Sequence, residues 1–149
     1  MFQLNLPSFP IQLGGTREKP EIFDFLRRRY VKLTPEEWVL QHFVHWLVTE
    51  KGYPKGLLGN EIALQCGSKP LRCVSILYNK QAQPMMIIEY KAPTVALNQK
   101  VFDQVSSYNL LLHVDYLMIS NGMQHFCCHM DYEHRCYSIL PDIPDYDDL

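Results

Sequence analysis

The chain has 149 residues, a formal net charge of −2 and a hydrophobic content of 47%, which together predict one globular domain with a single core. Proteins that hold nucleic acid by overall charge are usually strongly basic, so this balance excludes that mode and leaves only a local basic patch. Five cysteines without a repeated CxxC spacing are typical of a reducing compartment, and no apolar run is long enough to span a bilayer. We therefore predict a cytoplasmic protein without a membrane segment.

The N-terminal part of the chain is broken by prolines and glycines. Residues 1–20 are expected to form an arm with one short edge strand, followed by the domain proper over residues 21–141. This domain should open with a small hairpin whose strands are residues 22–24 and 29–33. The three arginines of residues 27–29 could contact phosphate, but a solvated turn is the interpretation that we favour.

A strong helix signal follows the hairpin. Thr34 can cap the helix, a proline occupies the first helical position, and Glu37 completes a capping box, so a helix is predicted over residues 35–50. His42 and His45 lie three residues apart on this helix, a spacing that is compatible with joint metal ligation. Because no third ligand is near in sequence, we interpret them as helix-face histidines with local partners.

The remaining chain alternates strand and helix patterns. Three strand-like runs separated by turns predict an antiparallel meander, and a second helix, a buried strand and a C-terminal hairpin follow. The pair Asn121-Gly122 is a strong signal for the turn of that hairpin region. The fold class is therefore α/β, with a mixed α+β sheet, and the acidic residues 142–149 are expected to be a loosely held tail. The strands are predicted at residues 57–64, 71–78, 85–90, 116–120, 124–130 and 135–140, and the second helix at 97–112.

The third meander strand ends in two charged side chains. In the stretch MMIIEYKAP, Glu89 and Lys91 are two residues apart and leave an extended strand from the same face. A carboxylate and an ammonium are costly to bury unless they pair with each other or hold something between them. Glu89-x-Lys91 is therefore the first candidate for chemistry.

The order of elements, with Glu-x-Lys on the third meander strand, resembles the PD-(D/E)XK nuclease core. The segments LTPEEWVLQHFVHWLVTEKGYPKGL, IIEYKAP, FDQVSSYN and LMISNGMQHFCC resemble the N-terminal domain of type I restriction enzyme R proteins, the HsdR family. Glu-x-Lys alone would be a weak signal, whereas the motifs are specific as a set. The resemblance covers most of the chain and implies a restriction-endonuclease-like core.

That family implies metal-dependent cleavage of DNA, in which Mg²⁺ or Mn²⁺ held by carboxylates activates a water molecule. By matching positions, Glu89 would be an acidic metal ligand, Lys91 the lysine that orients the water, and Gln104 the glutamine on the following helix. The other carboxylates open to the metal are Glu61 and Glu37. The residues implied in nucleic-acid contact are Arg72, Lys91 and Tyr108.

The chain departs from this family at one position. Where the family has an aspartate on the strand before Glu-x-Lys, this chain has Val74, and no acidic residue occurs between Glu61 and Glu89. Valine cannot bind a cation, so Lys91 can neutralise Glu89 without a metal. We predict weak or absent hydrolysis, with Mg²⁺ or Mn²⁺ as cofactor only if the site is active. The alternatives are a competent nuclease completed by Glu61 or Glu37, and a non-catalytic module that binds nucleic acid or protein.

The resemblance implies DNA as a partner and leaves a homodimer open. The chain has no GxxxxGK[ST] motif, so no nucleoside triphosphate site is expected. A zinc site built from Cys128, His134 and Cys136 would lack the usual paired spacing, and Cys127 and Cys128 should point to opposite faces of a strand. We interpret these cysteines as free thiols packed as small apolar residues.

Overall fold

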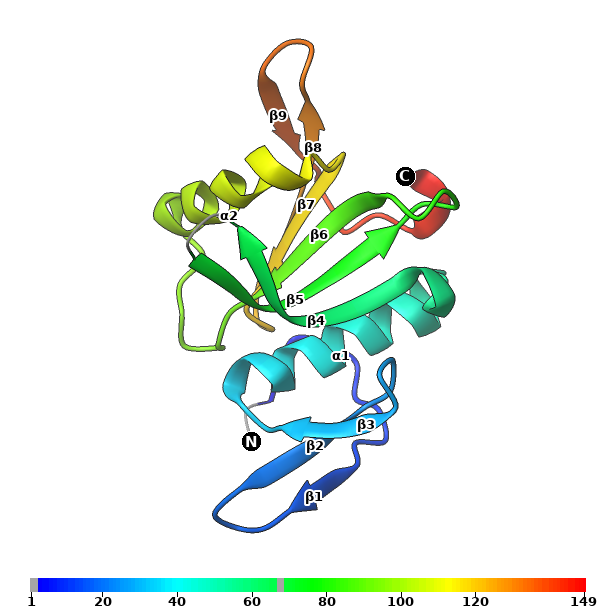
Figure 1. Cartoon of the computed structure of the whole chain (residues 1–149), viewed down its shortest axis with the longest axis vertical. Helices are drawn as coiled ribbons and strands as arrows, with labels where there is room; N and C mark the ends of the chain where they lie inside the picture. The colour runs from blue at the N-terminus through cyan, green and yellow to red at the C-terminus, as the bar shows by residue number, and fades with distance from the viewer. Residues whose placement is uncertain (1–2, 67–68) are drawn as a thin grey trace.

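A computed structural model of the chain describes residues 3–66 and 69–149; the side chains of residues 61–73 and 108–111 lie outside the description. The described chain forms a small antiparallel sheet, a larger mixed sheet and two α-helices (Figure 1). The small sheet consists of β1 (Leu13–Gly15), β2 (Pro20–Asp24) and β3 (Arg29–Lys32). The main sheet contains, in spatial order, β4 (Leu58–Cys66), β5 (Lys69–Tyr78), β6 (Pro84–Tyr90), β7 (Tyr116–Ser120), β8 (His125–Asp131) and β9 (Cys136–Ile139).

The two helices cover opposite faces of the main sheet. α1 (Pro35–Glu50) lies between the two sheets, and α2 (Gln99–Leu112) packs on the far face of the main sheet (Figure 1). Strands β6 and β7 are parallel because α2 forms the crossover between them, whereas the other neighbouring strands of the sheet are antiparallel. Short 3₁₀ turns, η1 (Lys55–Leu57) and η2 (Tyr146–Asp148), complete the described elements.

The alternation of side chains along each central strand divides the core in two. On β6, Ile88 joins the cluster under α1, and its neighbour Ile87 joins the cluster under α2. Cys127 and Cys128 are divided between the clusters in the same way, which confirms that they point to opposite faces of their strand. The central strands β6 and β7 are therefore buried on both sides, which explains their nearly continuous apolar sequences.

The predicted order of elements is confirmed. The amide of Glu37 donates to Thr34 Oγ1 at 3.0 Å, so the predicted helix cap is present. The return contact of the predicted capping box is not formed, because the Glu37 carboxylate accepts from Arg27 and Gln41 instead. The second helix begins two residues later than expected, since Asn98 Oδ1 accepts from the amide of Val101 and caps it. At the predicted turn after β7, Gly122 has a φ of 85°, a left-handed value that favours glycine.

Two expectations about the surface are wrong, one about the three arginines and one about the acidic tail. Arg27 is not solvated, because its Nε lies 2.7 Å from Asp24 Oδ2 and its Nη2 lies 3.4 Å from Glu37 Oε1. Only its neighbours Arg28 and Arg29 are exposed. Two arginines of this run are therefore exposed, while the third forms ion pairs with Asp24 and Glu37.

The acidic tail is held against the domain instead of being loose. Ile143 is buried in the core cluster under α1, and Tyr146 and Leu149 pack against that cluster. The hydroxyl of Tyr53 donates to the Pro144 carbonyl at 3.0 Å. Apolar residues spaced three apart among the acids bring this tail to the end of α1, where the amide of Tyr146 donates to the Lys51 carbonyl.

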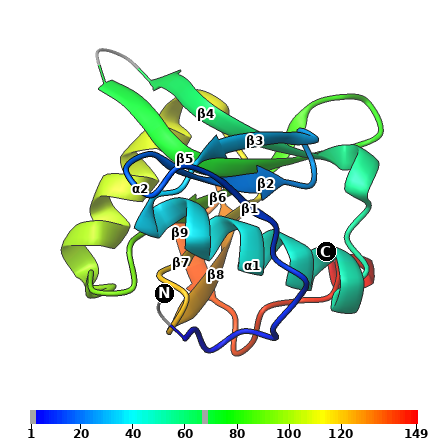
Figure 2. The same cartoon turned by 90° about the horizontal axis from the view of Figure 1, so that it is seen from below.

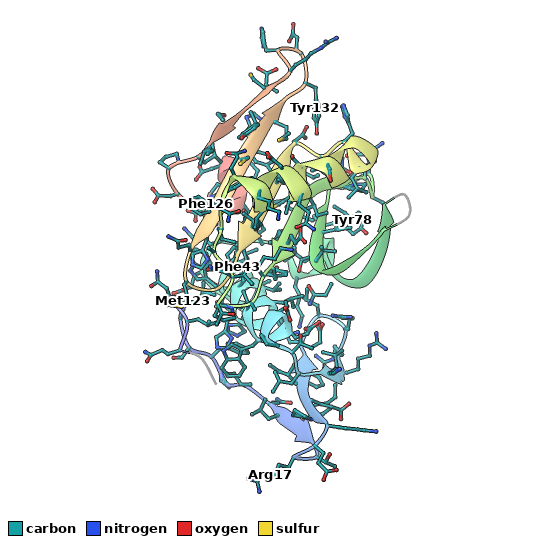
Figure 3. The ribbon with its side chains drawn as sticks, turned by 90° about the vertical axis from the view of Figure 1, so that its left-hand side faces the viewer. Arg17, Phe43, Tyr78, Met123, Phe126 and Tyr132 are labelled. Atoms are coloured by element: carbon teal, nitrogen blue, oxygen red, sulfur yellow. The ribbon has the colours of Figure 1, made fainter. Side chains whose placement is uncertain are left out.

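The molecule is elongated. Arg17, at the tip of the small sheet, and Tyr132, at the tip of the β8–β9 hairpin, lie at opposite ends (Figure 3). The N-terminal arm passes beside α1 before it enters β1 (Figure 2). Neither described helix combines the length and apolarity that crossing a membrane requires.

Candidate functional site

The predicted Glu89-x-Lys91 pair lies at the end of β6. Glu89 is 4% exposed, and its Oε1 lies 3.2 Å from Lys91 Nζ. The amide of Lys91 donates to the Ser120 carbonyl at 2.8 Å, which holds this end of the chain against β7. The two side chains therefore leave the same face and form a partly buried ion pair.

This ion pair leaves the carboxylate incompletely satisfied. Glu89 Oε2 is buried and has no hydrogen-bond partner among the described residues. Burial raises the pKa of Glu89 above its ordinary value of 4.5, and the attraction of Lys91 only partly opposes that effect. The site can therefore hold a proton on Glu89 more easily than an exposed carboxyl group would.

Val74 lies directly across from Glu89. The two residues are paired between the antiparallel strands β5 and β6, and Glu61 on β4 is paired with Val74 in turn. Val74 is fully buried and belongs to the apolar cluster that contains Val105 of α2 and Leu117 of β7. The position where the resemblance requires an aspartate is thus part of the core under α2.

The structure does not bring every expected site residue to Glu89. Gln104 is exposed on α2, and its side chain makes no hydrogen bond with Glu89 or Lys91, all three of which are described. Gln104 is next in sequence to Val105, which packs in the same cluster as Val74. The helix that carries Gln104 therefore covers the face of the sheet on which Val74 lies. The side chains of three other expected residues lie outside the described residues: Glu61, Arg72 and Tyr108.

Glu37 lies on the other side of the main sheet. Its carboxylate accepts from Arg27 and from Gln41 Nε2, each at 3.4 Å, within the layer of α1. Burial raises the pKa of Glu37, partly offset by the positive charge of Arg27. Glu37 therefore has partners of its own and does not meet Glu89 across the sheet.

The described residues do not fit a divalent metal at this site. Mg²⁺ and Mn²⁺ prefer several oxygen ligands, usually with more than one carboxylate. Within the described part of the chain, no three His, Cys, Asp or Glu side chains are grouped so that they could hold a metal ion. Glu89 is the described carboxylate of the site, and Lys91 already balances its charge.

A buried polar network that the sequence analysis missed braces both strands of the site. Asn60 Nδ2 donates to Asp24 at 3.1 Å, Ser75 Oγ donates to Asn60 Oδ1 at 2.6 Å, and Tyr90 OH donates to Ser75 Oγ at 2.9 Å. Ser75 follows Val74, and Tyr90 follows Glu89. The network thus fixes the neighbours of both facing residues and ties them to the small sheet.

Asp24 is the anchor of this network. Burial alone would raise its pKa, but hydrogen bonds and charge from Arg27, together with Asn60, hold the pKa below its ordinary value. Its Oδ1 also accepts from the amides of Leu26 and Arg27, as aspartate often does at the start of a turn. That turn signal could have been found in the sequence, whereas the partner on β4 could not.

The other candidate metal ligands are used locally or lie apart. Burial raises the pKa of Cys127 to about 12 and that of Cys128 to about 11, so both are thiols at neutral pH. His134 pairs with Asp131 at 2.8 Å on the exposed hairpin. His42 bonds the Trp38 carbonyl at 2.7 Å, which supports the interpretation of this histidine as a helix-face residue.

Comparison with known proteins shows a family and a related fold. The family model for the type I restriction enzyme R protein N terminus matches residues 35–144. A fragment structure from Vibrio vulnificus YJ016, described as an HsdR subunit of a type I restriction enzyme, superposes with a TM-score of 0.52 at 19% sequence identity. The match covers 78% of this chain and 24% of that one. No curated protein matches the chain.

The matched structure shares the fold of this chain, and the chain spans about a quarter of its length. The matched family segment begins with α1 and includes the strands that carry Val74 and Glu89, as well as Lys91 directly after β6. It extends to Pro144, whose carbonyl accepts from Tyr53. The chain belongs to the family of type I restriction enzyme R protein N-terminal domains.

Proposed function

We propose that this chain is a nuclease-like domain that contacts DNA and hydrolyses it weakly or not at all. The observation that carries the proposal is the pairing of buried Val74 with Glu89 across β5 and β6. A metal-dependent nuclease of the PD-(D/E)XK type needs a second carboxylate at the position of Val74. Here an isopropyl group occupies that position, and the remaining carboxylate is paired with Lys91.

Membership of a restriction enzyme family supports DNA as the partner. A divalent metal, if bound, would supply Lewis-acid activation of water and charge stabilisation at the phosphate. The residues that remain can do less. Lys91 can offer one positive charge to a phosphate oxygen, and Glu89 can accept or release a proton, but one carboxylate does not hold such a metal in place.

A second candidate function is a competent nuclease in which Glu61 replaces the missing aspartate. The backbone register favours it in one respect, because Glu61 belongs to the same cross-strand row as Val74 and Glu89. Directly paired residues of an antiparallel ladder lie on the same face of a sheet. A Glu61 carboxylate would then approach the site from β4 instead of β5.

Two assays on one preparation test the proposal. Binding of a labelled DNA duplex and of a single strand is measured by fluorescence anisotropy in the presence of a chelator. Nicking of supercoiled plasmid is then measured with Mg²⁺ and with Mn²⁺. We expect binding without nicking, and Glu89→Ala should leave the plasmid result unchanged.

Metal-dependent nicking that disappears in both Glu89→Ala and Glu61→Gln would overturn the proposal in favour of the second candidate. Nicking that survives both substitutions would indicate a contaminating nuclease, which a mock purification identifies. Absence of binding to either DNA form would remove the DNA part of the proposal.

A further inference from the structure

A second candidate site lies on the opposite side of α1 from the main sheet. A pocket of about 400 Å³ opens between the N-terminal arm, β2, the β2–β3 turn and α1. This volume falls within the range of small-molecule sites in proteins. Its principal lining residues are Phe9, Gln12, Phe23, Phe25, Arg28 and His45.

The walls of the pocket are aromatic and already ordered by contacts with one another. The rings of Phe9 and His45 are stacked with centroids 4.4 Å apart and an interplanar angle of 18°. Phe25 meets His45 edge-on at 5.5 Å. Aromatic side chains from the arm, the segment after β2 and α1 thus lie together, and a flat ring can pack against them.

A cation is held at the pocket by a strained turn. Arg28 has a φ of 57°, a left-handed value that is uncommon for a residue with a side chain. The turn is fixed from beneath, since Asp24 Oδ1 accepts from the amides of Leu26 and Arg27, and the Asp24 carbonyl accepts from the Arg28 amide. Asp24 is itself anchored to Asn60 of the main sheet.

The charges around the pocket select the ligand. None of its lining residues is acidic, and Lys55 Nζ lies 5.0 Å from the centre of the Phe25 ring, which adds a second positive charge. Burial lowers the pKa of His45 and is only partly opposed by the negative charge of Glu50, which favours the neutral ring at pH 7. A pocket that binds a cation between aromatic rings would not carry positive side chains at its edge. The positive charges of Arg28 and Lys55 therefore favour an anion that carries a flat ring.

We propose that this pocket binds a nucleotide, with its base against the aromatic walls and its phosphate at Arg28. The same chemistry is offered by an unpaired nucleotide in a DNA strand and by a free mononucleotide. The segment from residue 13 to residue 33 contains six Lys and Arg against three Asp and Glu, which suits a polyanion although the whole chain is slightly acidic. The pocket lies in the layer of α1, whereas Glu89 faces α2, so this inference does not depend on hydrolysis at Glu89.

The test measures binding of a dye-labelled single-stranded ten-nucleotide thymidine oligomer by anisotropy, with a chelator present. Arg28→Ala is compared with Arg29→Ala, because each removes one exposed positive charge at neighbouring positions but, of the two, only Arg28 lines the pocket. We expect about ten-fold weaker binding for Arg28→Ala and less than three-fold for Arg29→Ala. Phe9→Leu, which keeps an apolar side chain but removes the ring, should weaken binding several-fold.

Two further arms identify the source of the nucleotide. If thymidine monophosphate competes with an affinity similar to that of the oligomer, the ligand is a free nucleotide. If the oligomer binds at least ten-fold more tightly than the monophosphate, the ligand is an unpaired residue of a strand. Both results support binding of a nucleotide in the pocket, provided that Arg28→Ala weakens the binding that is measured.

Equal losses in Arg28→Ala and Arg29→Ala would overturn the proposal, because they would indicate general attraction to phosphate. Tighter binding of a blunt duplex than of the single strand would also overturn it, since a paired base cannot enter a pocket. Failure of both the oligomer and the monophosphate to bind would do the same. Arg28→Gly guards against misfolding, because glycine relieves the left-handed backbone while removing the guanidinium group.

Discussion

Val74 and Glu89 are paired across two neighbouring antiparallel strands, and both are almost completely buried. This pairing places an isopropyl group where a second carboxylate would be needed to hold a metal with Glu89. Lys91 then becomes the main partner of the remaining carboxylate.

Glu89→Gln should be tolerated and should change how stability depends on pH. The folded pKa of Glu89 is raised above 4.5 by burial, so the folded state loses stability as pH rises from that value through the folded pKa. Glutamine carries no charge and removes this loss. Urea unfolding across pH 4 to 8 should show that the free energy of unfolding of the variant increases relative to that of the wild type as pH rises. A wild-type advantage that grows with pH would contradict this reasoning.

Lys91→Met should be more harmful than Glu89→Gln, because it leaves a buried carboxylate without its counter-charge. We expect a loss of about 2 kcal/mol in the free energy of unfolding at neutral pH, and a smaller loss in acid. The double variant with Glu89→Gln should recover most of that loss. Additive effects in this double-mutant cycle would show that the two side chains are not coupled.

Asp24→Asn should loosen the junction between the small sheet and the main sheet. The substitution removes the charge that lies closest to the largely buried Arg27, which would keep only its longer contact with Glu37. We expect a loss of about 2–4 kcal/mol in the free energy of unfolding and faster trypsin cleavage at the three arginines of residues 27–29. Glu18→Gln, at an exposed position, is the matched control. Unchanged cleavage would mean that Asp24 does not hold this turn.

The stability that Asp24 contributes to the folded state should also decrease in acid. Its pKa is held below 3.8 in the folded state, so the stability that it contributes is present above that value and lost as pH falls through the folded pKa. The difference in unfolding free energy between wild type and Asp24→Asn should therefore shrink below about pH 3.8. A difference that is constant with pH would point to lost hydrogen-bond acceptors instead of lost charge.

Removing residues 142–149 should destabilise the domain, although their composition suggests a free tail. The truncation uncovers the core at Ile143 and removes the carbonyl that accepts from Tyr53 OH. We expect a loss of about 2–4 kcal/mol in the free energy of unfolding. Ile143→Ala in the full chain separates the apolar part of this effect. A truncated domain with wild-type stability would show that these contacts contribute nothing.

The sequence was sufficient to predict the order of elements because local signals agreed with the final packing. Thr34 and Glu37 mark the start of α1, and the apolar runs before Glu89 and after Asp115 have the length of buried strands. The relationship of Val74 to Glu89 was also accessible, since two strands joined by a short turn must be antiparallel neighbours. Family motifs then supplied the chemistry expected at that position.

The remaining features depend on contacts between distant residues. Asp24 and Asn60 are far apart in the chain, and nothing in either local sequence indicates that one binds the other. The prediction of a loosely held tail is wrong because it rests on the acidic residues, whereas the burial of Ile143 determines where the tail packs. The pocket beside Arg28 needs three separate segments to meet, so no local pattern could reveal it.

The most direct test of the account is a calorimetric titration of Mn²⁺ into the wild type beside Val74→Asp, with Val74→Asn as the uncharged control. The new carboxylate should lower stability without metal, and a metal that binds only the folded state should restore it. We predict no binding to the wild type or to Val74→Asn, and measurable binding to Val74→Asp. Binding of Mn²⁺ to the wild type with an affinity similar to that of Val74→Asp would contradict the account.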